Sequence, residues 1–135
     1  DHTAGLVIDP QISGEAAAVA SQEIQIINAL CDSTGFCMFL GPSIDETRQF
    51  FNHFFGEDVS CEQVANIGWQ CLLDEWAFND RAGFTESDDD MAACLREEGI
   101  GPDHEFKFDE PSDIIAKAKV RQPATENFFT KSPAG

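Results

Sequence analysis

The stretch Glu15–Leu30, with the sequence EAAAVASQEIQIINAL, determines the fold class expected for this chain. It is rich in Ala, Gln and Glu, which favour helices. Its apolar residues also recur at the spacing of one helix side: Val19, Ile24, Ile27 and Leu30. The pattern predicts a helix that ends near Cys31, because this periodicity is the main signature of an amphipathic helix.

Four further helices are expected, separated by turns that Gly and Pro mark. Their predicted ranges are 43–55, 60–79, 89–98 and 112–119. Ser60 and Gln63 have the spacing of a capping box at the start of the third helix, and Gly83 is its expected end. That helix is expected to bury one apolar side: Val64, Ile67, Cys71, Leu72 and Phe78.

The remaining segments add little regular structure to this picture. Phe106-Lys107-Phe108 alternates like a brief strand, and the Pro-rich and Thr-rich tail over residues 122–135 is expected to be poorly ordered. The sequence therefore predicts an all-α fold, with one helical domain over residues 1–121.

Composition and charge narrow the class of function. Of 135 residues, 42% are hydrophobic, including 12 Phe and 2 Trp, so the chain can bury a core. A formal net charge of −17 excludes nucleic acid and anionic membranes as natural partners, because their phosphates would be repelled. No apolar run approaches the ~20 residues that span a bilayer, and no signal peptide is evident.

The five cysteines contain no C-x-x-C pair. This spacing argues against a disulfide framework and against a self-contained zinc site, and a reducing cytoplasm is the expected location. The chain opens on Asp1 without an initiator Met, so we expect it to be a piece of a longer protein.

Asp32-Ser33-Thr34-Gly35-Phe36-Cys37 places a carboxylate, a flexible glycine and a thiol within six positions after the first helix. Such a turn can direct one sulfur at a metal cluster while Asp32 and nearby amides bind a polar cofactor. The alternative interpretation is a plain helix end, in which Gly35 takes a left-handed conformation and Cys37 packs inside.

Three elements in order resemble one enzyme family. The first is the Asp32–Cys37 stretch, similar to D-x-x-G-L-C, and the second is Phe55-Gly56-Glu57-Asp58-Val59-Ser60. The third is Phe78-Asn79-Asp80-Arg81-Ala82-Gly83-Phe84, followed by Asp88-Asp89. Together they resemble the C-terminal domain of the tungsten-containing, molybdopterin-type aldehyde:ferredoxin oxidoreductases.

The resemblance implies roles for four residues of the first element. Cys37 matches the family's fourth thiolate ligand of a [4Fe–4S] cluster, a task that suits a soft sulfur ligand. Asp32 matches the carboxylate that accepts hydrogen bonds from the pterin ring. Gly35 and Phe36 match positions where the backbone approaches the pterin, with Phe36 in place of the commoner Leu.

His2 is the catalytic candidate. The segment from His2 to Gly5, followed by an apolar stretch with Pro10, resembles the family segment in which a His near the metal exchanges a proton with the substrate carbonyl. Imidazole suits this role because its pKa lies near neutrality.

The resemblance implies that the whole enzyme oxidises an aldehyde to a carboxylic acid. Electrons would pass from a tungsten or molybdenum bis-pterin through the [4Fe–4S] cluster to ferredoxin. The family's other three cluster cysteines, spaced C-x-x-C-x-x-x-C, are absent from this chain. We therefore expect the isolated chain to be inactive and free of cofactor, with the remaining domains of the enzyme as its first partners.

Two alternatives remain open on sequence grounds. A small, acidic, helical protein can be an inhibitor or immunity-type binding module, with Cys37 buried and one contiguous acidic side. A second alternative is a fragment of a related tungsten aromatic acyl-CoA reductase subunit, which shares the family fold.

Overall fold

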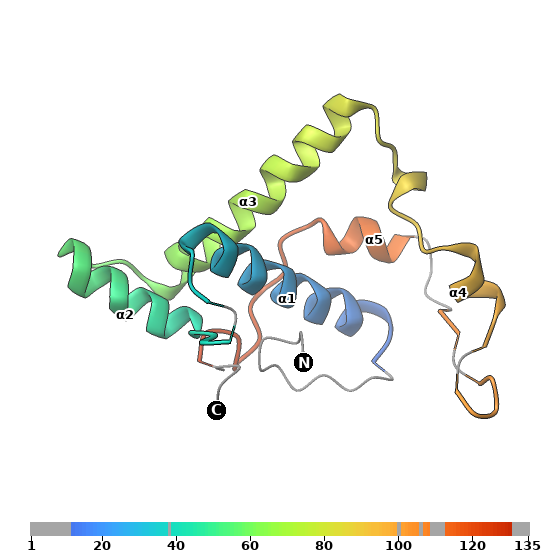
Figure 1. The fold of residues 1–135 in the computed structure, drawn as a ribbon, viewed down its shortest axis with the longest axis horizontal. Helices are drawn as coiled ribbons and strands as arrows, with labels where there is room; N and C mark the ends of the chain where they lie inside the picture. The colour runs from blue at the N-terminus through green and yellow to red at the C-terminus, as the bar shows by residue number, and fades with distance from the viewer. Residues whose placement is uncertain (1–11, 38, 100, 106, 109–112, 131–135) are drawn as a thin grey trace.

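The structure is helical wherever it is described, and its two longest helices cross each other (Figure 1). It is a computed structural model that describes residues 12–37, 39–99, 101–105, 107–108 and 113–130. The helices are α1 (Gly14–Thr34), α2 (Ile44–Phe55), α3 (Cys61–Ala82), the 3₁₀ turn η1 (Glu86–Asp88), α4 (Ala93–Glu97) and α5 (Asp113–Ala118). No strand occurs in the described ranges, and the all-α prediction is confirmed.

Helix α1 continues past its predicted end. Asp32 and Thr34 lie in its last turn, where the Thr34 hydroxyl donates to the carbonyl oxygen of Leu30 at 2.8 Å. Gly35 then ends the helix with φ 74°, and its N–H donates to the carbonyl oxygen of Cys31 at 3.0 Å. A left-handed residue at this position favours Gly, which lacks the Cβ that would clash.

Capping boxes begin α2 and α3. Ser43 and Glu46 exchange side-chain and backbone hydrogen bonds at the start of α2. Ser60 and Gln63 do the same at the start of α3, as their spacing predicts. Each box satisfies two N–H groups that have no partner within the helix, so it defines where the helix begins.

The core lies where α1 crosses α3. The backbones approach so closely that a Cβ added at Gly68 would lie 2.2 Å from the carbonyl oxygen of Ile26. Helix α5 packs against α1, and α2 packs against α3. The buried apolar residues of this core come from α1, α2, α3 and the C-terminal segment: Ile26, Ile27, Ala29, Leu30, Ile44, Val64, Ala65, Trp69, Leu72 and Phe128.

One predicted side of α3 is not buried. Val64 and Leu72 belong to the core, whereas Ile67 is 39% exposed and Phe78 is 64% exposed. Cys71 is only partly buried. The prediction is therefore wrong for Ile67 and Phe78 and correct in part for Cys71, which packs against the core. The reason is that α1 covers the Gly68 side of α3 and leaves the neighbouring side open.

The C-terminal segment is anchored to α1. Both ends of the Gln22 amide hold it: Nε2 donates to the carbonyl oxygens of Ala118 and Val120 at 2.6 and 2.9 Å, and Oε1 accepts from the Gln122 N–H at 2.8 Å. Phe128 is fully buried in the core. The expected poorly ordered tail is therefore corrected over residues 122–130, and residues 131–135 lie outside the described ranges.

The region between α3 and α5 has less regular structure than predicted. The helix expected over 89–98 is reduced to α4, because the acidic run before it forms η1 and a turn in which Arg96 pairs with Asp90. Residues 107 and 108 of the brief strand expected over 106–108 are described, and they form no strand. The Phe108 N–H donates one hydrogen bond to the Leu95 carbonyl oxygen. Phe106 lies outside the described ranges.

No helix in the described ranges is both long enough and apolar enough to cross a bilayer. The longest, α3, has 22 residues but carries charged side chains on its exposed sides.

A pH-dependent contact joins the start of α2 to the start of α3. Asp45 accepts hydrogen bonds from Arg48 at 2.8 Å, from Gln49 at 2.7 Å and from the thiol of Cys61 at 3.5 Å. The Arg48 guanidinium, followed by the Gln49 amide, lowers the pKa of Asp45 below its ordinary value of 3.8.

Because the pKa of Asp45 is lowered on folding, its contribution to stability is present above pH 3.8 and is lost as the pH falls through the lowered pKa. We expect Asp45→Asn to lower the free energy of unfolding at pH 7 by less than ~1 kcal/mol, since the pair is near solvent. Below the lowered pKa, the free energies of unfolding of Asp45→Asn and the wild type should become equal. Urea unfolding at a series of pH values measures both. A difference that persists unchanged at acid pH contradicts the assignment.

Candidate functional site

Four of the predicted site residues lie together at the C-terminal end of α1. Asp32 is exposed in the last helical turn, Gly35 ends the helix, and Cys37 follows after Phe36 with its thiol exposed. The Cys37 carbonyl accepts the N–H groups of residues 40 and 41 at 2.9 and 3.1 Å, which closes a tight turn. The fold thus presents a carboxylate and a thiol at one end of a rigid helix.

Asp32 and Cys37 both lie close enough to Cys31 for their charges to act on its thiol. Cys31 lies beside them in the last turns of α1 and is partly buried. Burial, with smaller contributions from Asp32 and Cys37, raises the pKa of the Cys31 thiol above its ordinary value of 9.0. Because Cys31 is partly buried and Cys37 is exposed, Cys37 is the more accessible sulfur of this turn.

The helix-end interpretation of this stretch is half correct. Gly35 does take the left-handed conformation that ends α1. Cys37, however, is exposed and does not pack inside. A structural role explains the glycine and leaves the thiol without one.

His2 lies outside the described residues, so its role in proton transfer stays a prediction. The two described histidines bond to nearby backbone: His53 Nδ1 lies 2.8 Å from the Gln49 carbonyl oxygen, and His104 Nδ1 lies 2.9 Å from that of Gly99. Neither belongs to the turn that carries Asp32 and Cys37.

The donor set of the turn fits one corner of a metal cluster and not a whole site. No group of three or more His, Cys, Asp or Glu side chains with metal-binding geometry occurs in the described part of the chain. A [4Fe–4S] cluster needs four thiolates, and Cys37 supplies one at this position. Any cluster bound here takes its other ligands from elsewhere.

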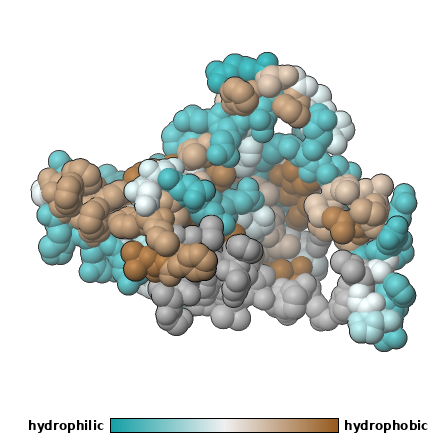
Figure 2. All heavy atoms as spheres, viewed as in Figure 1, coloured by the Kyte–Doolittle hydropathy of each residue, from teal (hydrophilic) through white to brown (hydrophobic). Residues whose placement is uncertain are grey.

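An aromatic surface lies beside the turn, and sequence reasoning did not assign it a function. We define the α2 aromatic surface as the partly exposed Phe36 together with the exposed apolar residues of the turn and of α2: Phe39, Leu40, Phe50, Phe54 and Phe55. Figure 2 shows apolar side chains gathered over the α2 end of the molecule. The sequence signal was present, since α2 contains four Phe within six residues.

Ring contacts hold this surface together. The rings of Phe36 and Phe50 meet edge to face with centroids 5.3 Å apart, which ties the turn to α2. Phe50 stacks on Phe54 at 5.5 Å, and Phe54 meets Phe55 at 4.9 Å. Phe39 is 96% exposed and Phe54 is 70% exposed. Contiguous exposed apolar area of this kind marks an interaction site.

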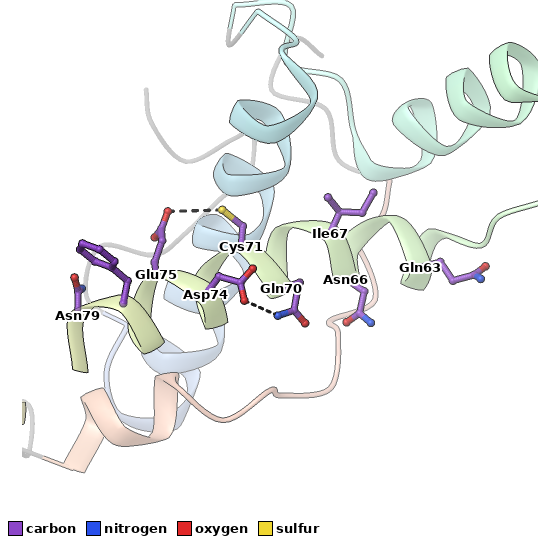
Figure 3. Close-up of a pocket in the computed structure, with 9 residues that line it drawn as sticks. Gln63, Asn66, Ile67, Gln70, Cys71, Asp74, Glu75 and Asn79 are labelled. Atoms are coloured by element: carbon purple, nitrogen blue, oxygen red, sulfur yellow. Dashed lines mark hydrogen bonds between the residues drawn. The ribbon is translucent and has the colours of Figure 1, made fainter. Parts of the chain in front are cut away.

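A separate groove of about 990 Å³ runs along the open side of α3 from Gln63 to Asn79 (Figure 3). No residue of the turn from Asp32 to Cys37 lines it. This groove is therefore distinct from the candidate cofactor site.

Comparison with known proteins identifies the lineage. The family model described as "Aldehyde ferredoxin oxidoreductase, domains 2 & 3" matches residues 2–117, which is most of the chain. This match confirms the resemblance inferred from the three sequence elements. No curated protein and no solved structure matches the chain.

Proposed function

The chain belongs to the aldehyde ferredoxin oxidoreductase family, and we propose that its Asp32–Cys37 turn forms one wall of a tungsten or molybdenum pterin site. The whole enzyme oxidises an aldehyde and water to a carboxylic acid, two protons and two electrons, and ferredoxin accepts the electrons. It works in the cytoplasm. The observation that supports this proposal is the joint exposure of Asp32 and Cys37 at one end of α1.

Each residue of the turn has a separate task. The Cys37 sulfur, as thiolate, is the fourth ligand of a [4Fe–4S] cluster, and soft sulfur suits iron in such clusters. The Asp32 carboxylate accepts hydrogen bonds from N–H groups of the pterin ring. Gly35 and Phe36 offer their backbone to the pterin, and the absence of a Cβ at Gly35 allows close approach. His2 exchanges a proton with the substrate carbonyl.

The chain provides part of the site. When bound, the pterin-held metal supplies the two-electron oxidation, and the cluster carries electrons singly. The isolated chain is expected to bind neither group, because three of the four cluster thiolates come from outside it. Burial of the α2 aromatic surface by the rest of the enzyme would explain why so much apolar area lies beside Cys37.

The acidic binding module is the weaker alternative. That hypothesis requires Cys37 to be buried as a plain core residue, whereas its thiol is exposed. An aromatic acyl-CoA reductase subunit would use the same turn, and an assay with aldehydes against aromatic thioesters separates it from the aldehyde enzyme.

Replacement of Cys37 tests the proposal in the full-length enzyme. We expect Cys37→Ser to lose the [4Fe–4S] electron paramagnetic resonance signal and to lower the iron content, because a hydroxyl is a poor substitute for a soft thiolate ligand. Cys94→Ser is the matched control, since Cys94 is also exposed but lies in α4. Asp32→Ala should lower the pterin content and leave the iron content unchanged. Full iron content and an unaltered signal in Cys37→Ser would overturn the ligand assignment.

A further inference from the structure

The open side of α3 is a long surface with two exposed apolar side chains. The groove extends from Gln63 to Asn79, which corresponds to roughly 24 Å of helix at 1.5 Å per residue. Ile67 is 39% exposed and Phe78 is 64% exposed, with the partly buried Cys71 between them. Only α3 residues line the groove in the described structure, so its opposite side is open to a partner.

The same groove is acidic. Asp74 and Glu75 line it, and each carboxylate accepts a bond from its own helix: Asp74 from Gln70 Nε2 at 2.9 Å and Glu75 from the Cys71 thiol at 3.7 Å. No Lys, Arg or His is among the described residues that line it. Both negative charges therefore lack a cationic partner among the described residues of the groove.

Charge and spacing together determine the occupant. Ile67, Cys71 and Phe78 lie four and seven residues apart along α3, the spacing that receives the apolar side of a helix laid along a surface. The carboxylates of Asp74 and Glu75 favour a partner helix with positively charged side chains beside its apolar side. A second copy of this chain does not fit, because it carries the same net charge of −17.

We propose that the α3 groove binds a basic amphipathic helix of a separate partner protein. Its composition distinguishes it from the α2 aromatic surface, which consists of Phe and Leu side chains and suits permanent burial within one enzyme. Most residues that line the α3 groove are polar or charged, as in interfaces that form and dissociate. This inference does not depend on the roles of Asp32 and Cys37.

The direct test uses a synthetic 16-residue helical peptide with Leu on one side and Lys on the other, titrated by calorimetry into the full chain. We expect binding that weakens as salt is added, because the attraction is between exposed charges. Phe78→Asp should lower the affinity about tenfold or more, since it removes the main apolar anchor. This variant adds a negative charge, so attraction by net charge alone would instead strengthen binding.

Two charge-matched variants locate the acidic contribution. Asp74→Asn with Glu75→Gln should weaken binding, whereas Glu57→Gln with Asp58→Asn, at exposed positions between α2 and α3, should leave it unchanged. Circular dichroism confirms the fold of each variant, and none of the five replaced side chains is buried.

Four outcomes would overturn the proposal. In the first, Phe78→Asp binds the peptide as tightly as the wild type or more tightly. In the second, the two charge-matched pairs of substitutions lower the affinity equally. In the third, a peptide with Glu in place of Lys binds the wild type as tightly as the Lys peptide. The fourth is failure of the full-length enzyme to bind a peptide that the isolated chain binds, which would show that another domain of the enzyme occupies the groove.

Discussion

Gly68→Ala is expected to destabilise the domain by about 3 kcal/mol, the cost of overpacking a tight core. The added Cβ would lie 2.2 Å from the carbonyl oxygen of Ile26 and 3.0 Å from the amide nitrogen of Leu30. Both contacts are with the backbone of α1, which cannot move aside as a flexible side chain can. The two helices must therefore separate where they cross, and the surrounding core contacts loosen.

The direction of this effect is diagnostic. Within a helix, Ala is more favourable than Gly by ~1 kcal/mol, so the substitution would stabilise α3 if nothing opposed Gly68. Urea unfolding of the variant measures the net change. Asn66→Ala, two residues earlier at an exposed position, is the matched control and should change the free energy of unfolding by less than ~0.5 kcal/mol. A Gly68→Ala protein more stable than the wild type contradicts the close crossing.

Phe128→Ala is expected to lower the free energy of unfolding by about 3–5 kcal/mol, as for other large side chains removed from a core. Phe128 is 0% exposed and belongs to the cluster built by α1 and α3. Its ring lies 5.2 Å from that of Phe129, and the Arg121 guanidinium lies 5.7 Å from its centroid. Truncation leaves a cavity beneath residues 121–130, which form no helix and so depend on this packing for their order.

Phe54→Ala provides the comparison, because Phe54 is 70% exposed on the α2 aromatic surface. Its replacement should change the free energy of unfolding by less than ~0.5 kcal/mol in the isolated chain, as for other exposed positions. Thermal and urea unfolding monitored by circular dichroism measure both variants. Equal, small effects at the two positions would show that residues 121–130 do not belong to the packed unit.

Local sequence was sufficient to predict where the long helices lie. Capping boxes and left-handed glycines act within a few residues, so Ser60 with Gln63 and Gly83 locate the ends of α3 without reference to the rest of the fold. Short elements were predicted less well. The expected helix over 89–98 has few apolar contacts, and its acidic start forms η1 instead.

The C-terminal segment shows why composition misleads. Pro and Thr in residues 122–130 suggest a loose tail, and the segment is indeed irregular. What orders it is contact over about a hundred residues of chain: Glu23 accepts hydrogen bonds from both the N–H and the hydroxyl of Thr125, at 2.7 and 3.0 Å. Such distant partners leave no periodic signal near Phe128.

Sequence also predicted some features of the candidate site and missed others. The three sequence elements in their order, of which the Asp32–Cys37 stretch is the first, were enough to predict the family, which the match over residues 2–117 confirms. The order of Asp32, Gly35 and Cys37 was also enough to place these residues at a helix end, because they follow an apolar periodicity that ends there. Exposure of the Cys37 thiol did not follow from the pattern, since a helix-end Cys can as well be buried.

The sequence alone determined the helical class of this protein, the ends of α2 and α3, and the family to which it belongs. Packing determined which apolar residues are covered. Val64 and Ile67 are both apolar and lie on neighbouring turns of α3, yet Val64 is buried against α1 and Ile67 lines the open groove. A crossing helix covers only one side of α3. Gly68, which lacks a Cβ, lets the backbone of α1 approach closely on that side.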